Sequence, residues 1–304
     1  MNKNLFKAYL ALACVCFFWG TTYVAIRVGV QTIPPLWLVG IRQTLAGLLI
    51  VGFFVVKGHP LPTLSQLKSL FLAGMLMIVV GNGFISWAEV HVPSGLTALL
   101  CSLVPFWIIG FNGLTRQTEG LNSQALVGLL VGLSGLLFIF YDTLDDLANP
   151  AYLGGIVGIL IANAGWAGGT VYIKQHPNAL PPLLAAGLQI LLAGLTVDVL
   201  AVVFEQPLRP ETVTPAAWWS LIYLILFGSI LAYGAYVYAL TQLSATVVSL
   251  YAYVNPVVAV LLGWLWLDEK LTPAVWTAMA LILTGVWIVN RSLATARRKV
   301  LKNS

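Results

Sequence analysis

The sequence predicts an all-α integral membrane protein, with ten transmembrane helices arranged as two inverted five-helix repeats. Three observations lead to this prediction: the scarcity of charge, the number of long apolar segments and an internal duplication. Hydrophobic residues make up 60% of the 304 residues and charged residues only 8%, whereas a soluble domain carries about 25% charged residues. The composition therefore excludes a water-soluble fold.

The apolar segments are long enough to cross a bilayer, which takes about 20 predominantly apolar residues in a helix. Ten candidates are found: 8–28, 35–56, 69–88, 93–114, 124–141, 152–173, 182–203, 217–240, 245–267 and 274–290. The connections between them are short, so no attached soluble domain is expected. The first segment follows Lys3 and Lys7 like a signal peptide, but it lacks a small-x-small cleavage site and is interpreted as a retained helix.

The basic residues indicate how the chain is oriented, because Lys and Arg are enriched on the cytoplasmic side of membrane proteins. With a cytoplasmic N-terminus, that side receives Lys3, Lys7, Lys57, Lys68, Arg116, Lys174, Arg291, Arg297, Arg298, Lys299 and Lys302, and the other side receives Arg27, Arg209 and Lys270. Both termini are therefore expected in the cytoplasm. The basic segment 292–304 is expected to be a tail held near anionic membrane lipid, rather than a nucleic-acid-binding patch.

The duplication relates the two halves of the chain. Residues 19–48 match residues 166–195 without a gap at an offset of 147, with eleven identities in thirty positions. The identical pairs include Trp19 and Trp166, Pro34 and Pro181, and Pro35 and Pro182. Shared hydrophobicity alone does not align a tryptophan and paired prolines, so we predict two repeats over 8–141 and 152–291. Each contains five spans, and this odd number inverts the second repeat, an arrangement common in secondary transporters.

A weaker match at an offset of 151 pairs Pro105 with Pro256, each within a predicted span. A proline within a helix frees a carbonyl and kinks the axis, and in a membrane the freed group must be satisfied by protein or by a wet cavity. Asn255 adds an amide that also needs partners. Two interpretations stay open: static kinks that help packing, or kinks that shape a cavity between the repeats.

Polar residues within spans are the best indicators of a site, because they tend to face the bundle interior. Asn82, Ser86 and Glu89 follow one another at i, i+4 and i+7 and therefore share a helical face. Glu89 is a candidate for coupling transport to protons or for accepting a substrate amine. The alternative is a solvated carboxylate at the end of the span, beside His91.

Aromatic and amide side chains complete the predicted cavity. The candidates are Trp19, Tyr23, Asn163, Trp166, Tyr236, Tyr251 and Asn255, several of them spaced so as to share a helical face. Such aromatic rings can stack on a planar or apolar solute while an amide fixes a polar group. The competing explanation for the aromatic residues is the interfacial belt, in which Trp and Tyr are enriched.

Other buried polar groups are assigned to packing or anchoring. Arg42 lies well inside the second predicted span and Asp198 inside the seventh, so the two can pair across the bundle, although no spacing supports this. Cys14, Cys16 and Cys101 fall within predicted spans without metal-ligand spacing, so they are expected to be packing residues. No metal site and no cofactor are predicted.

Several longer motifs occur in a characteristic order: "FFWGTTYVAIRVGV" in the first span, "VGNGFISWAEVHVPSGLTALL" across the third and fourth, and "YAYVNPVVAVLLGWLWLDEKLT" in and after the ninth. Over roughly residues 8–290 the chain resembles the drug/metabolite transporter superfamily, specifically its ten-helix EamA-domain exporters. The resemblance implies a bacterial cytoplasmic (inner) membrane protein that exports small metabolites, such as amino acids, by alternating access. Substrates differ widely within the family, so the solute is not implied.

Two other functions were weighed against export. A membrane-embedded enzyme would need a base, a nucleophile or a metal at membrane depth, but all three histidines fall near span ends and no HExxH motif occurs. We therefore predict no enzymatic activity. The chain also lacks a nucleotide-binding P-loop, so the energy source is an ion gradient, with protons as a candidate partner, or the protein is a proton-independent facilitator.

Overall fold

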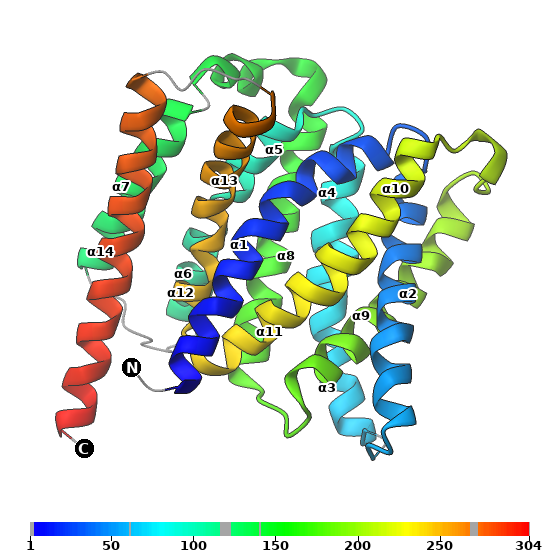
Figure 1. The fold of residues 1–304 in the computed structure, drawn as a ribbon, viewed down its shortest axis with the longest axis horizontal. Helices are drawn as coiled ribbons and strands as arrows, with labels where there is room; N and C mark the ends of the chain where they lie inside the picture. The colour runs from blue at the N-terminus through cyan, green and yellow to red at the C-terminus, as the bar shows by residue number, and fades with distance from the viewer. Residues whose placement is uncertain (1–2, 61, 116–122, 140, 268–272, 304) are drawn as a thin grey trace.

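The computed structural model describes residues 3–60, 62–115, 123–139, 141–267 and 273–303, and these residues form a helical bundle without strands (Figure 1). The first half contains α1 (Lys3–Gly29), α2 (Pro35–Val56), α3 (Leu64–Gly74), η1 (Met75–Asn82), α4 (Gly83–Ala88), α5 (Ser94–Cys101), α6 (Val104–Leu114) and α7 (Ser123–Ile139). Short 3-10 turns η2 (Tyr141–Ala148) and η3 (Pro150–Tyr152) lead into the second half. That half contains α8 (Leu153–Gln175), α9 (Pro182–Phe204), η4 (Pro210–Thr212), α10 (Pro215–Tyr223), η5 (Leu224–Ala232), α11 (Tyr233–Gln242), α12 (Ala245–Ser249), α13 (Tyr251–Leu267) and α14 (Pro273–Asn303).

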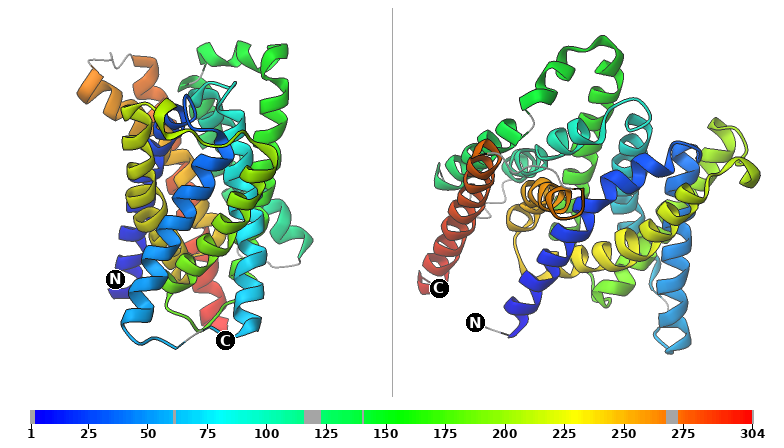
Figure 2. Two further views of the ribbon diagram at one scale, coloured as in Figure 1. Left: turned by 90° about the vertical axis from the view of Figure 1, so that its right-hand side faces the viewer. Right: turned by 45° about the horizontal axis from the view of Figure 1, so that its top comes forward.

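Each of the ten predicted segments coincides with helix. In the described part of the chain, eight helical segments are long and apolar enough to cross a membrane, and two further apolar helices, Ser123–Ile139 and Ala245–Val258, are shorter. Helices run side by side between the two ends of the bundle, and both chain ends lie toward the same end (Figures 1 and 2). Arg116 and Lys270, used above to infer orientation, lie outside the described residues.

Two helix pairs form opposite edges of the bundle: α2 with α9, and α7 with α14 (Figure 1). Glycine allows both pairs to approach closely. A Cβ atom added at Gly47 would lie 2.7 Å from the Cα of Leu191, and one added at Gly135 would lie 2.6 Å from the carbonyl oxygen of Ala278. In lipid, where apolar burial between helices gains little, such close packing is a main source of association.

Proline and a distant carboxylate define where α2 begins. Pro35 is its first residue, where the missing N–H costs nothing, and Pro182 begins α9 in the same way. Glu205, which follows α9, accepts hydrogen bonds from the backbone N–H of Leu36 at 2.9 Å and of Trp37 at 3.2 Å. Burial raises the pKa of the Glu205 carboxyl, and these hydrogen bonds lower it in part.

Four of the segments are not regular helices. The third and eighth contain the π-helices η1 and η5, which lie between α-helical turns at corresponding positions in the two halves. The fourth breaks between α5 and α6, where Pro105 is the second residue of α6, and the ninth breaks at Leu250. Pro256 lies inside α13, six residues after that break. Short interruptions of this kind often mark functional sites.

The C-terminal segment continues the last helix. α14 extends through Arg291 to Asn303, beyond the predicted end of the last span at residue 290. The basic residues of 292–304 therefore lie on a helical extension in the part that the structure describes.

Candidate functional site

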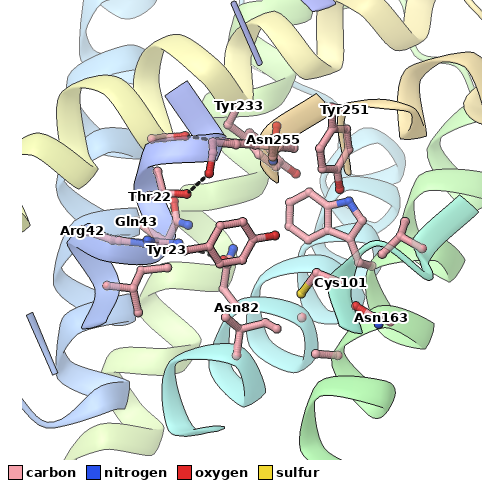
Figure 3. A pocket seen from close by; sticks show the side chains of 18 residues that line it. Thr22, Tyr23, Arg42, Gln43, Asn82, Cys101, Asn163, Tyr233, Tyr251 and Asn255 are labelled. Carbon is pink, nitrogen blue, oxygen red and sulfur yellow. Dashed lines mark hydrogen bonds between the residues drawn. The ribbon is translucent and has the colours of Figure 1, made fainter. Parts of the chain in front are cut away.

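A pocket lies in the middle of the bundle, between helices from both halves of the chain. Its cavity volume is about 90 Å³, room for only a few water molecules. Eighteen residues line it: Trp19, Thr22, Tyr23, Ile26, Arg42, Gln43, Gly81, Asn82, Ile85, Cys101, Val104, Ala162, Asn163, Trp166, Gly228, Tyr233, Tyr251 and Asn255. Figure 3 shows Tyr23, Asn82, Cys101, Asn163 and Tyr251 arranged around the same space.

Seven of the nine residues predicted to form the cavity are part of this wall. They are Trp19, Tyr23, Asn82, Asn163, Trp166, Tyr251 and Asn255. Ser86 is fully buried but does not line the pocket, and its hydroxyl has no hydrogen-bond partner. Tyr236 lies behind the wall, where its hydroxyl is 2.5 Å from that of Thr170.

The aromatic side chains form one cluster at the pocket. The ring centroids of Trp19 lie 5.2 Å from Trp166, 5.0 Å from Tyr236 and 4.9 Å from Tyr251. Tyr233 joins the cluster at 6.2 Å from Trp166. The Trp19 and Trp166 rings meet edge to face, with an interplanar angle of 81°, an arrangement that aromatic pairs prefer. The two tryptophans matched by the duplication are therefore in direct contact at the pocket.

The indole N–H groups of this pair are bonded differently. Trp19 Nε1 donates to the carbonyl oxygen of Gly228, in η5, at 3.1 Å. Trp166 Nε1 is buried and has no hydrogen-bond partner. Its ring lies against η1, where a Cβ at Gly81 would be 3.2 Å from the Trp166 Cε3 atom. Sequence periodicity gave no sign of either π-helix, since η1 is apolar up to Asn82 and η5 is apolar except for Ser229.

Asn255 joins two helices at the pocket. With its amide oriented so that both ends are satisfied, Nδ2 donates to the carbonyl oxygen of Tyr251 at 2.8 Å and to that of Cys16 at 2.9 Å. The second bond crosses from α13 to α1, close to Gly20, where a Cβ would lie 3.0 Å from the Asn255 carbonyl oxygen. Asn255 therefore helps to hold α13 against α1 where both helices form the pocket wall. A second amide, Asn163, donates to the carbonyl oxygen of Leu100 at 2.8 Å.

Arg42 is the one charged residue in the pocket wall. Its side chain is 5% exposed, and Nη2 donates to the Asn82 Oδ1 atom at 2.9 Å. Asp198 does not pair with it, because the Asp198 Oδ2 atom accepts from the Thr44 hydroxyl at 2.6 Å. Both Arg42 and Gln43 were missed as site residues, since a single polar pair in an apolar segment does not reveal which way it faces.

Glu89 follows α4 and is fully buried, so the alternative of a solvated carboxylate is wrong for this conformation. Neither of its carboxylate oxygens has a hydrogen-bond partner. Arg27 donates to the backbone carbonyl of Glu89. The positive charges of Arg27 and Arg42 both favour the ionised form of the Glu89 carboxyl group, against its burial. Glu89 does not line the pocket.

No metal ligands gather at this site. Within the described residues, no group of three or more His, Cys, Asp or Glu side chains could hold a metal ion. Cys14 and Cys16 are free thiols in α1, and Cys101 is a free thiol in the pocket wall.

Comparison with known proteins identifies the family. The model of the EamA-like transporter family matches residues 6–141 and again residues 153–291. The inner membrane transporter YedA of Escherichia coli K12, described as uncharacterized, is 35% identical over 94% of this chain and 92% of its own. Protein PecM of Dickeya dadantii is 30% identical over 93% and 92%, and transporter YoaV of Bacillus subtilis 27% over 97% and 99%.

One solved structure shares the fold, with a TM-score of 0.74 over 96% of this chain and 98% of that chain at 20% identity. Two family matches, relatives aligned over nearly their full length and a common fold agree with one another. The chain belongs to the EamA-like transporter family of membrane transporters.

Proposed function

We propose that this protein is a secondary transporter that exports small metabolites, amino acids or related compounds, across the cytoplasmic membrane by alternating access. The observation that carries this proposal is the pocket, because both halves of the chain contribute its wall: α1, α2, η1, α4, α5 and α6 from one, and α8, η5, α11 and α13 from the other. Relative movement of two halves around a shared central site is how inverted-repeat transporters expose it to either side in turn.

In this proposal all ten segments cross the membrane, as repeats over 8–141 and 152–291 with both termini in the cytoplasm. The shorter helix α7 has 17 residues, which span about 26 Å at 1.5 Å per residue, and it packs along α14. An even number of crossings agrees with the position of both chain ends toward one end of the bundle (Figure 1).

The unequal bonding of the tryptophan pair supports two exchangeable conformations. One indole N–H is satisfied by a carbonyl of η5, and that of Trp166 is buried without a hydrogen-bond partner, on a ring whose Cε3 edge lies against Gly81 of η1. If the halves exchange conformations, Trp166 gains a carbonyl of η1 while Trp19 loses that of Gly228. Each conformation then leaves one buried donor unsatisfied, so the two can have similar free energies.

Glu89 supports proton coupling. An ionised carboxylate without partners at this burial costs far more free energy than a protonated one, so movement that wets the Glu89 side chain would change its protonation. The alternative within the same family is a facilitator that needs no proton, in which Glu89 has only a structural role.

Flux through proteoliposomes tests both statements. We would measure efflux of radiolabelled neutral and aromatic amino acids, organic acids and nucleosides, with and without a pH gradient, for wild type and Glu89→Gln. Efflux that the gradient stimulates only in the wild type is the expected result. Gradient-independent efflux that the substitution leaves unchanged would identify a facilitator, and the absence of flux for every solute would contradict the transport proposal.

A further inference from the structure

Arg42 is buried in the pocket wall and makes no direct ion pair within the described residues. Nη2 bonds only to the neutral amide of Asn82, and Nε has no hydrogen-bond partner. The nearby carboxylate, Glu89, does not bond to it, because neither Glu89 oxygen has a partner. Keeping a guanidinium charge in a buried position without a direct counter-ion is unfavourable, so this arrangement leaves Arg42 able to bind an anion in the pocket.

The pocket has a polar and an aromatic part. Arg42 is the eighth residue of α2, which begins at the end of the bundle opposite the chain termini, and Asn82 lies beside it (Figures 1 and 3). Tyr251 is the first residue of α13, and the preceding helix α12 starts toward the end of the bundle where the chain termini lie. Its ring, together with Trp19 and Trp166, forms the aromatic part. The cavity of about 90 Å³ is smaller than a solute that spans both parts, so binding requires the two halves to move apart and widen it. A solute that then contacts both parts needs an anionic group and an apolar body.

We propose that Arg42 is the specificity-determining residue of this pocket, and that the solute it recognises is a monoanion with a carboxylate at one end and an apolar or aromatic body at the other. Arg suits this role because its planar fork of donors matches the two oxygens of a carboxylate. This inference rests on the proposed function, since it names the chemical class that the transporter carries.

The single charge argues for a monoanion rather than a phosphate ester. Of the eighteen lining residues only Arg42 is cationic, and a phosphate carries nearly two negative charges at neutral pH. The next cation, Arg27, does not line the pocket and donates to the Glu89 backbone. An apolar cation is disfavoured for the same reason, because the wall carries a positive charge and no carboxylate.

Binding to the purified full-length protein tests the inference without requiring transport. The probes are 3-phenylpropanoate and 4-methylpentanoate, each compared with its primary amide, and the readouts are calorimetric titration and the ligand-induced shift in Tm. Each amide matches its acid in shape and lacks only the charge. We expect each acid to bind at least about tenfold more tightly than its amide, as the loss of a hydrogen bond to a charged group predicts.

Variants assign the preference to one side chain. Arg42→Gln should remove the preference for acids, and Arg42→Lys should keep it with weaker binding, because the charge remains while the fork is lost. Arg27→Gln is the matched control: it deletes the same charge outside the pocket wall and should retain the preference. Unliganded Tm and size-exclusion profiles identify any variant that fails to fold. If Arg42→Gln fails to fold, Arg42→Lys and Arg27→Gln still test the role of Arg42, because only Arg42→Lys should weaken the binding of acids.

Three results would overturn the inference: amides that bind as tightly as acids, an acid preference that survives Arg42→Gln, or no binding of either acid to the wild type. These results are distinguishable from failure of the transport proposal. Acid-selective binding without flux of any solute would leave Arg42 as an anion site and refute transport. Flux of neutral or cationic solutes without acid preference would refute the role of Arg42 alone.

Discussion

Replacing either tryptophan of the central pair by phenylalanine should move the conformational equilibrium, and the two replacements should move it in opposite directions. Both substitutions remove an indole N–H and shrink one ring of the aromatic cluster, so their packing costs are closely matched. They differ in what the N–H does: Trp19 Nε1 donates to the Gly228 carbonyl at 3.1 Å, and Trp166 Nε1 has no partner in this conformation.

The size of the effect follows from one neutral hydrogen bond, which contributes about 1 kcal/mol net. Trp19→Phe removes this bond from the described conformation only, and a loss of about 1 kcal/mol changes the equilibrium about fivefold toward the alternative. Trp166→Phe removes an unsatisfied buried donor from the described conformation and a hydrogen bond from the alternative. Its shift is therefore of similar or larger size, toward the described conformation.

Distance measurements between the two halves read the populations. Spin labels at the exposed positions His91 and Glu211, one in each half, would be introduced after replacing Cys14, Cys16 and Cys101 by serine. Pulsed electron resonance on the protein in lipid then gives the weights of the two distance populations. The unsubstituted Trp pair provides the reference distribution.

Shifts of the same sign in both variants would refute this reasoning, because they would reflect loss of ring packing rather than of the N–H groups. Unchanged populations in both variants would mean that the Trp19 bond with Gly228 persists in every conformation. In either case the unequal bonding of the pair would be a static feature, and alternating access would need a different structural basis.

Substitutions at four further positions test the packing and caps that hold the pocket. Gly47→Ala should lower the free energy of unfolding by about 1–3 kcal/mol, because its Cβ would meet the Leu191 backbone. Gly52→Ala, on the same helix but with open space around it, is the control and should raise the free energy of unfolding by about 0.5–1 kcal/mol. Glu205→Ala should cost about 1 kcal/mol in denaturant titrations. Since its folded pKa is raised, wild type should also lose stability relative to Glu205→Gln as pH rises through that pKa. Asn255→Ala should lower Tm and flux together, because it frees the Cys16 and Tyr251 carbonyls; unchanged flux would separate the α1–α13 contact from transport.

The helices and much of the pocket could be predicted from the sequence, because both follow from local patterns. Apolar length located every segment, and the duplicated tryptophan located the centre of the cluster. Tyr251 and Asn255, four residues apart, share a face as predicted and both line the pocket.

The remaining features depend on contacts between helices, which periodicity does not encode. One predicted stripe contains Asn82, Ser86 and Glu89, yet only Asn82 lines the pocket. The segment α4 packs against both α8 and α2, so the residues of one helical face have different neighbours. The partner of Arg42 was missed for the same reason. Glu205 lies far from Leu36 in sequence, and only the pairing of α2 with α9 brings its carboxylate to the start of α2.

The sequence repeat does not extend to the charged residue of the pocket, and this difference bears on how one pocket could serve the two conformations proposed above. At the offset of 147 that aligns Trp19 with Trp166, the counterpart of Arg42 is Gln189. Both side chains are buried, but Gln189 bonds to the Met77 Sδ atom at 3.4 Å and does not line the pocket. In the proposed mechanism the two conformations are close in free energy, so that a solute contact can shift the equilibrium between them. Because Arg42 has no charged counterpart in the second half, that mechanism requires the same guanidinium to contact the solute whichever side the pocket faces.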